Sequence, residues 1–241
     1  MQAFAKSDIG RVRESNEDSF LCLSPLFVVA DGMGGHVAGE IASKMATDII
    51  KRCIIKNEYL KDPALALAEA VGDANTEVYR LSQENDQYAG MGTTVTAAYF
   101  DDNKIYWCHV GDSRIYLIRD NQLTQITPDH SLVGELVRSG NITPEEALIH
   151  PQRNILTRAV GTGETVSSES GIIDCLPGDM LLLCTDGLTN MVREEKILEV
   201  IRIADKDSAL ALETLVQLAN SAGGVDNITA ILVQCGEVKY E

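Results

Sequence analysis

Apolar stretches of strand length, separated by short polar turns, recur along most of the chain. Turn sequences such as Ser24-Pro25 and Asp120-Asn121 lie between consecutive stretches, where they favour tight reversals of the backbone. Runs of this length bounded by turns predict β-strands rather than helices. The predicted strands cover residues 2–9, 19–23, 26–31, 93–100, 105–110, 114–118, 172–175, 180–184 and 228–233.

Two early segments change from this pattern to apolar residues at every third or fourth position, which predicts amphipathic helices. The second of them starts at Asp62-Pro63, where an N-cap residue precedes a proline in the first turn. Two further helices are predicted near residues 193–202 and 208–222, the latter closed by Gly223. The first helix is expected to face a core with one broad stripe, and the second with a stripe of its own. The first stripe is Val37, Ile41, Met45, Ile49 and Cys53 with Ala38, Ala42 and Ala46 beside them, and the second is Leu67, Val71, Ala74, Val78 and Leu81.

The segment of residues 127–168 interrupts the strands with short helices and loops. One helix is expected over residues 132–137, and the sequence Thr-Pro-Glu-Glu at residues 143–146 is a capping box for another. Such an insertion predicts a mobile flap beside the core. Residues 129–131 (Asp-His-Ser) have the residue types of a catalytic triad, but direct sequence neighbours cannot assemble one, so helix capping explains them better.

Aspartates close or open four of the apolar runs. Asp31, Asp112 and Asp186 each follow a run, and Asp226 precedes the last one. The Asp31-Gly32 pair by itself also fits a type I′ turn between two strands, so the single motif leaves both alternatives open. Four acid-bearing strand ends favour a convergent site, because isolated buried carboxylates cannot stay charged cheaply without cations. Ligands that are all oxygen atoms indicate Mg²⁺ or Mn²⁺ rather than Zn²⁺.

The composition narrows the classes of partner. The chain has 20 Lys and Arg against 36 Asp and Glu, a formal net charge of −16, which argues against nucleic acid or an anionic membrane as the main partner. Hydrophobic residues make up 45% of the chain and no linker-like stretch divides it, so residues 1–241 are expected to form one domain. No signal peptide or apolar run of membrane length is found, which predicts a soluble, cytoplasmic protein.

The positions of the cysteines and of His109 in the sequence favour structural roles over metal binding or catalysis. The six cysteines never form a Cys-x-x-Cys pair and several lie within apolar runs, so neither a structural disulfide nor a zinc site is expected. His109 lies in mid-strand, on the same alternating face as Ile105 and Trp107. This position predicts a histidine packed in the core rather than a catalytic one.

Six motifs in a fixed order give the chain a family resemblance. They are Arg13-x-x-Asn16-Glu17-Asp18, Val29-Ala30-Asp31-Gly32-Met33-Gly34-Gly35-His36, Gly90-x-Gly92-Thr93-Thr94, His109-Val110-Gly111-Asp112-Ser113-Arg114, Thr185-Asp186-Gly187-Leu188 and Asp226-Asn227-Ile228-Thr229. Over residues 6–234 they resemble the compact bacterial form of the metal-dependent protein phosphatase 2C family. The resemblance implies an α+β fold, a four-layer α-β-β-α sandwich in which helices flank two antiparallel sheets. Residues 127–168 then form a flap insertion in one phosphatase catalytic domain.

The resemblance also implies the reaction, which is hydrolysis of phosphoserine and phosphothreonine in proteins by a hydroxide that bridges two Mn²⁺ or Mg²⁺ ions. Asp31 would bridge the two ions, and the carbonyl of Gly32 would bind the second. Asp186 and Asp226 would complete the first ion. Asp112, together with Asp186, would hold a weaker third ion.

The loop before the second predicted strand receives its roles only through the resemblance, since by composition it is an ordinary charged loop. Arg13 would bind the substrate phosphate and act as a catalytic residue beside the metal-binding aspartates. Glu17 and Asp18 would act through metal-bound waters. Where eukaryotic members of the family have a histidine proposed to protonate the leaving alkoxide, this chain has Met33. Either His36 or a metal-bound water would replace it, and water is favoured because glycines precede His36.

The implied partners are phosphoproteins and a cognate bacterial serine/threonine kinase, with the enzyme acting as a monomer. Two alternatives stay open. The chain could be a phosphatase for one regulatory protein of a stress-response pathway, or a catalytically weak relative that only binds phosphoproteins. All four aspartates and Arg13 are present, which counts against a protein that only binds.

Overall fold

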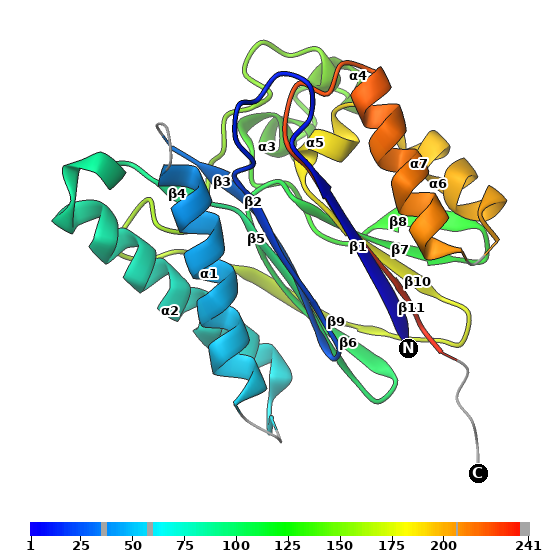
Figure 1. Ribbon diagram of the computed structural model, residues 1–241, viewed down its shortest axis with the longest axis horizontal. Helices are drawn as coiled ribbons and strands as arrows, with labels where there is room; N and C mark the ends of the chain where they lie inside the picture. The colour runs from blue at the N-terminus through cyan, green and yellow to red at the C-terminus, as the bar shows by residue number, and fades with distance from the viewer. Residues whose placement is uncertain (35–37, 57–59, 206, 237–241) are drawn as a thin grey trace.

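Two antiparallel sheets stack face to face in the computed structural model, which describes residues 1–34, 38–56, 60–205 and 207–236 (Figure 1). The first sheet has the order β1-β11-β10-β7-β8 and consists of β1 (Gln2–Asp8), β11 (Ile228–Gln234), β10 (Met180–Cys184), β7 (Arg114–Arg119) and β8 (Gln122–Gln125). The second has the order β2-β3-β5-β6-β9 and consists of β2 (Asp18–Leu23), β3 (Leu26–Met33), β5 (Val95–Asp101), β6 (Lys104–Val110) and β9 (Glu169–Asp174), with the short β4 (Gly92–Thr93) paired to β3.

Helices cover the outer face of each sheet. On the second sheet lie α1 (Ala38–Ile55) and α2 (Pro63–Glu84), which is followed by the short 3₁₀ helix η1 (Asp86–Tyr88). On the first sheet lie α5 (Asp186–Thr189), α6 (Glu194–Ile203) and α7 (Ser208–Ser221). The flap contains α3 (Leu132–Arg138) and α4 (Pro144–Leu148). The expected four-layer α-β-β-α sandwich is therefore confirmed (Figure 1).

Three apolar layers hold the sandwich together. The layer between the sheets joins Phe27 and Ile105 of the second sheet to Leu181 and Ile231 of the first, all fully buried. The two other layers lie between each sheet and its helices. Strands with apolar residues on both faces are required in this arrangement, because both faces of each sheet are covered.

Most elements lie where the apolar pattern predicted them, and the differences have local causes. The capping box at Thr143 and the N-cap at Asp62 are both present. In α1 the predicted broad stripe faces the core. Its buried side chains include Ala38, Ala42, Ala46 and Ile49, and the small alanines allow close packing on α2 and β3. Val37, from that stripe, lies outside the described residues. The predicted strand over residues 93–100 is divided into β4 and β5.

The β1–β11 pair brings the first and last strands of the chain together. Its register runs from Gln2 opposite Gln234 to Asp8 opposite Ile228. The start of β1 and the end of β11 therefore lie side by side in the first sheet (Figure 1).

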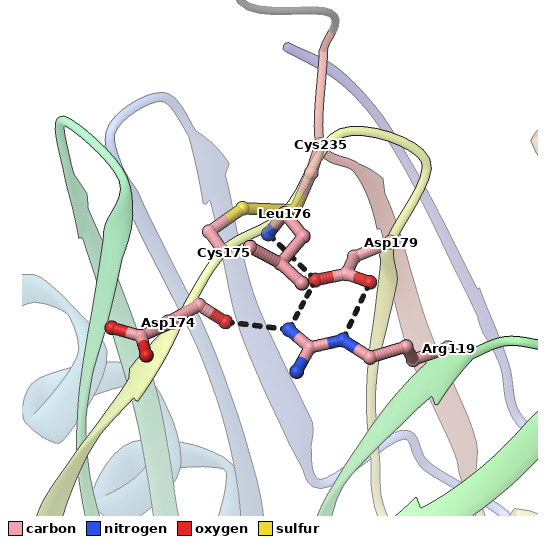
Figure 2. The surroundings of a disulfide bond; sticks show 6 residues. All are labelled: Arg119, Asp174, Cys175, Leu176, Asp179 and Cys235. Atoms are coloured by element: carbon pink, nitrogen blue, oxygen red, sulfur yellow. Dashed lines mark hydrogen bonds and ion pairs between the residues drawn. A yellow bond between two sulfur atoms is a disulfide. The ribbon is translucent and has the colours of Figure 1, made fainter.

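A disulfide between Cys175 and Cys235 contradicts the expectation that the cysteines form none (Figure 2). Cys175 follows β9 of the second sheet and Cys235 follows β11 of the first, so the bond joins the two sheets. Beside it, the buried carboxylate of Asp179 accepts hydrogen bonds from the Arg119 guanidinium at 2.9 and 2.6 Å. Spacing rules for cysteines missed this pair because its partners are 60 residues apart and only the stacking of the sheets brings them together.

Reduction of the disulfide should lower the melting temperature by about 4–16 °C. A native disulfide typically contributes about 2–4 kcal/mol, and a domain of this size shifts by roughly 2–4 °C per kcal/mol. The measurement is thermal unfolding with and without dithiothreitol, on wild type and on the Cys175→Ser/Cys235→Ser double variant. The double variant should melt at the temperature of the reduced wild type, and a Cys22→Ser control should behave like wild type. A wild-type melting temperature unchanged by the reductant would contradict the prediction.

Among the described residues, no helix has the length and apolar character needed to cross a membrane.

Candidate metal centre

The four predicted aspartates line one cavity of about 420 Å³. Asp31 lies in β3 and Asp112 follows β6, so the second sheet supplies two of them. Asp186 follows β10 and Asp226 precedes β11, so the first sheet supplies the other two. The two stacked sheets thus deliver their acidic residues to the same end of the sandwich.

Threonines of the β4–β5 junction fix the backbone of Asp31. Thr94 accepts a hydrogen bond from the Asp31 amide at 2.9 Å through its hydroxyl, and its own amide donates to the Asp31 carbonyl at 2.8 Å. The same hydroxyl lies 2.7 Å from that of Ser113, the neighbour of Asp112. This interruption of the predicted strand is therefore what links the Asp31 and Asp112 segments.

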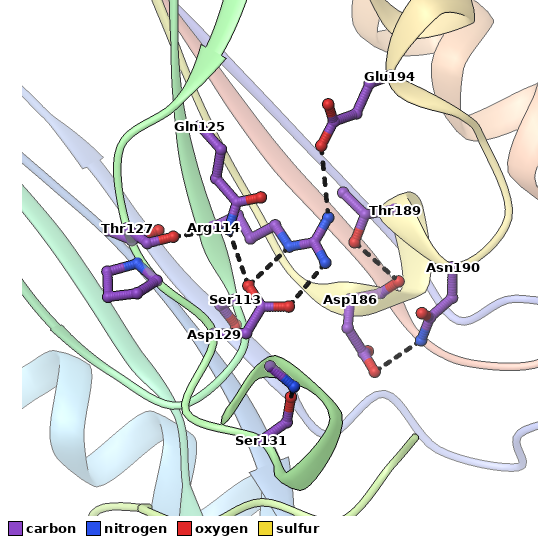
Figure 3. Close-up of polar contacts among 12 residues, drawn as sticks. Ser113, Arg114, Gln125, Thr127, Asp129, Ser131, Asp186, Thr189, Asn190 and Glu194 are labelled. Atoms are coloured by element: carbon purple, nitrogen blue, oxygen red, sulfur yellow. Dashed lines mark hydrogen bonds and ion pairs between the residues drawn. The ribbon is translucent and has the colours of Figure 1, made fainter. Parts of the chain in front are cut away.

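The first sheet holds its acids by side-chain contacts. The Asn190 amide of the α5 C-terminus donates to Asp186 at 2.9 Å (Figure 3). The Thr185 hydroxyl donates at 2.9 Å to the buried Asp18, whose backbone lies opposite Asp31 in the β2–β3 pair. Asp18 is not among the residues that line the cavity and lies behind it.

Asn227 anchors the loop that carries Arg13. Its side-chain amide donates to the carbonyls of Ile9 and Ser15 at 3.0 and 2.9 Å, and its side-chain oxygen accepts from the Glu17 amide at 2.8 Å. These three bonds hold the loop at the start of β11. Residue patterns gave Asn227 no role, although it stands next to Asp226 in a recognised motif.

Arg13 reaches the cavity from this loop, and its guanidinium lies 2.8 Å from the Asp226 carboxylate. The ion pair raises the pKa of Arg13 above its usual value. At 46% exposure, the Arg13 side chain also remains open to a ligand entering from solvent. The loop that looked like an ordinary charged loop is thus part of the cavity wall.

Gly32 occupies a point of close backbone approach. Its amide donates to the Glu17 carbonyl at 3.2 Å, and a Cβ at this position would overlap the carbonyl oxygen of Gly39 in α1. Only glycine lets β3, the Glu17 segment and the helix meet here. Glu17 itself is buried and lines the cavity.

Withdrawal from water and mutual repulsion raise the pKa values of the clustered carboxyl groups. Burial raises the pKa of Asp18 to about 7. Burial, followed by repulsion from neighbouring acids, also raises the pKa values of Asp31, Asp112 and Asp186. Buried oxygens of Asp18 and Asp186 have no hydrogen-bond partner among the described residues. An uncompensated set of carboxylate oxygens is suited to hard divalent cations.

The acids of the cavity do not form a compact ligand group on their own among the described residues. No three Asp, Glu, His or Cys side chains in the described part of the chain form a compact ligand group by themselves. Asp226 is instead paired with Arg13. The cavity therefore collects the acids without closing them around a single point.

Without metal, the folded protein should become less stable as pH rises from about 4 to about 7. The folded state binds protons at Asp18 more tightly than the unfolded chain does, so this stabilising contribution is complete below the unfolded pKa and is lost as pH rises through about 7. Melting temperatures of chelator-treated protein between pH 4 and pH 8 measure the decline. It should be several degrees smaller in Asp18→Asn. Equal profiles for the two proteins would contradict the raised pKa.

The other candidates from the sequence behave as the patterns indicated. His109 is fully buried between the Thr96 hydroxyl at 2.8 Å and the Pro128 carbonyl at 3.1 Å, and burial lowers its pKa to about 3. It is a core histidine. Ser131 is the N-cap of α3 and forms no triad, since its hydroxyl accepts from the Gly134 amide at 3.2 Å. His36 lies outside the described residues.

The flap adds cavity residues that sequence patterns missed. They come from its second half and contain no acids, so no charge pattern marked them. The flap residues lining the cavity are Asn154, Leu156, Thr157, Arg158, Ala159 and Thr162.

A family profile described as Protein phosphatase 2C matches residues 12–225, a span that includes every cavity-lining aspartate except Asp226. The chain belongs to the protein phosphatase 2C family. Protein phosphatase PhpP of Streptococcus pneumoniae is 39% identical to this protein phosphatase 2C over 248 residues, which cover 100% of both chains. The family assignment explains why acids from separate strand ends meet in one cavity.

Solved structures of the family have the same fold. The crystal structure of the Mycobacterium tuberculosis serine/threonine phosphatase PstP/Ppp superposes with a TM-score of 0.92 at 40% identity, covering 98% of this phosphatase 2C chain and 99% of the other. The catalytic domain of PstP in complex with two manganese ions superposes with a TM-score of 0.88 at 39% identity, covering 96% of each chain. The α+β sandwich and the metal dependence expected from the motifs therefore agree with the family.

Proposed function

We propose that this protein phosphatase 2C hydrolyses phosphoserine and phosphothreonine residues of proteins at the cavity described above, with two Mn²⁺ or Mg²⁺ ions. Relatives that match nearly the full length of this chain include proteins named as serine/threonine phosphatases, and the alternative of a protein that only binds phosphoproteins is not favoured. The observation that carries the proposal is the convergence of Asp31, Asp112, Asp186 and Asp226 on one cavity.

The donor set of the cavity fits hard divalent cations. Every candidate ligand is an oxygen atom, and the buried oxygens of Asp18 and Asp186 that lack a hydrogen-bond partner among the described residues leave lone pairs available to a cation. Asp31, Asp186 and Asp226, with the Gly32 carbonyl, would hold two ions, and Asp112 with Asp186 a weaker third. Glu17 and Asp18 would act through water. Water would also complete the coordination, since the side chains do not form a closed group.

Bound ions of this kind lower the pKa of water towards neutrality and polarise a phosphoryl oxygen. The chain's own residues supply the rest of the chemistry. The Arg13 guanidinium offers parallel N–H donors to the phosphoryl oxygens, a geometry that lysine lacks. Thr94 and Asn190 keep Asp31 and Asp186 in place through the hydrogen bonds already described. No cysteine, serine or histidine nucleophile is required.

The leaving serine or threonine alkoxide needs a proton. Met33 lines the cavity, but its thioether has no proton to give. We assign the role of proton donor to a water molecule in the cavity, because the acids beside it would hold such a water by hydrogen bonds.

The proposal extends to the cellular role. A serine/threonine kinase must supply the phosphoproteins that such an enzyme consumes, and we propose that a kinase of the same cell is opposed by it. We further propose that residues 1–241 act as one catalytic domain, as a monomer, in the cytoplasm. Sedimentation velocity on the purified protein would test the monomer.

Replacement of Arg13 tests the phosphate-binding role. Hydrogen bonds to a charged group contribute about 1.5–3 kcal/mol, so kcat/KM for an aryl phosphate with Mn²⁺ should fall roughly 10- to 150-fold in Arg13→Ala. Arg13→Lys should recover only part of this loss, because lysine keeps the charge without the fork of donors.

Arg11→Lys is the matched control for the arginine variants. Arg11 lies on the same loop but does not line the cavity, so its variant should keep wild-type kinetics. Unchanged kcat and KM in Arg13→Ala would refute the proposed role of Arg13 in binding the substrate phosphate.

A further inference from the structure

A second cavity, of about 660 Å³, adjoins the metal centre. It shares two lining residues with the first cavity, Asp112 and Asp186. From there it runs between the flap helices α3 and α4 on one side and the α5–α6 segment on the other. We call this second cavity the flap groove. Its continuity with the metal centre means that a molecule bound at one can extend into the other.

The flap wall of this groove presents apolar side chains to solvent. Leu148 and Ile149 at the end of α4 are 54% and 80% exposed, and Val133 and Val137 of α3 lie deeper in the same lining. Exposed aliphatic side chains within a cavity, surrounded by polar residues, are typical of binding surfaces. The rim has both signs of charge, with Arg138, Arg153 and Arg193 as well as three glutamates. The groove can therefore distinguish between ligands by the apolar side chains that they offer to its wall.

The floor of the groove is fixed by a partly buried polar network (Figure 3). Arg114 of β7 donates to both carboxylate oxygens of Asp129 at 2.9 and 2.7 Å, and Gln125 donates to the same carboxylate at 2.9 Å. The Tyr116 hydroxyl donates to Glu194 of α6 at 2.9 Å. These bonds tie the root of the flap and the start of α6 to one strand. The fixed floor reduces the conformational entropy that the groove would lose when a ligand binds.

We propose that the flap groove binds the polypeptide beside the phosphorylated residue of the substrate, with an apolar substrate side chain packed on Leu148 and Ile149. The inference rests on the proposed function, because it needs the phosphoryl group at the metal centre. An extended chain advances about 3.3 Å per residue, so residues a few positions from the phosphorylated one reach the groove. The enzyme then favours phosphorylation sites that have leucine-like residues beside the phosphorylated one, whatever the net charge of the surrounding peptide.

Paired phosphopeptides test this inference. Two phosphothreonine peptides of equal length and charge are compared, one with leucine at positions two to four on both sides of the phosphothreonine and one with serine there. Wild type should show at least about tenfold higher kcat/KM for the leucine peptide, the range that small apolar contacts give in a hydrophobic site. Leu148→Ser/Ile149→Ser should bring the ratio close to one, while its hydrolysis of an aryl phosphate with Mn²⁺ stays at the wild-type rate.

Ile203→Ser provides the matched control. Ile203 of α6 is 74% exposed and lies outside the groove, so its variant should keep the leucine preference. A wild type without preference, or a double variant that keeps it, would overturn the proposal. If the double variant melts at a lower temperature than wild type, the single variant Ile149→Gln replaces it with the same expected loss of preference. If wild type fails to hydrolyse the aryl phosphate, the proposed function itself is wrong and the inference falls with it.

Discussion

Asp31→Asn should reduce Mn²⁺-dependent hydrolysis of an aryl phosphate by more than about a hundredfold, since even outer-shell partners of a metal typically contribute 10- to 100-fold. The asparagine side chain has one anionic oxygen fewer than aspartate, at the cavity that the acids of both sheets line. It keeps the size of the side chain, and the Asp31 amide and carbonyl that bond to Thr94 are unchanged. The loss should therefore appear in kcat without loss of the fold. The measurement is initial rates at saturating Mn²⁺, with circular dichroism to verify folding.

Asp120→Asn is the control for this variant. Asp120 has a positive φ of 50° in the β7–β8 turn, a conformation that asparagine tolerates well, so its variant should keep both rate and stability. Near-normal turnover in Asp31→Asn would refute the assignment of Asp31 as a metal ligand.

Complete removal of divalent metal should abolish hydrolysis and also lower the melting temperature. The carboxylates of the cluster are buried and repel one another, and both effects raise the pKa values of Asp31 and Asp112. A ligand that binds only the folded state stabilises it by about 2.7 kcal/mol at 100 times its Kd. For a domain of this size that corresponds to an increase of roughly 5–11 °C. Chelation followed by titration with Mn²⁺, monitored by activity and thermal unfolding, measures both effects.

The same titration, repeated with Mg²⁺, compares the effects of the two ions on activity and melting temperature. It is also carried out on Asp186→Asn beside wild type. Asp186 has a buried oxygen without a hydrogen-bond partner in the described structure, so its variant should show a much smaller metal-induced shift. Activity that survives chelation, or a melting curve indifferent to Mn²⁺, would contradict a metal centre at this cavity.

Much of the site could be predicted because its chemistry lies at strand ends. A strand closed by an acid, as at Asp31 and Asp186, is a local pattern, and in the fold these strand ends line one cavity. The helix caps at Asp62 and Thr143 were predictable for the same reason, since each depends on neighbouring residues. The four-layer fold was predicted only through the resemblance to the family.

Features that depend on contacts distant in sequence could not be predicted. Asn227 bonds to residues about 210 positions away, and Cys175 and Cys235 meet only because the sheets stack. Gly32 gave no hint that it lies against the Gly39 carbonyl.

The pairing of the first and last strands has a practical consequence for handling the enzyme. Asp226 precedes β11 at the metal centre, whereas Gln234 ends that strand beside Gln2. Seven residues of extended chain, each advancing about 3.4 Å, separate the two ends. A fluorophore, affinity handle or surface tether attached before Gln2 or after Gln234 is thus anchored some 20 Å from the metal centre, so immobilised enzyme should turn over phosphoproteins without obstruction.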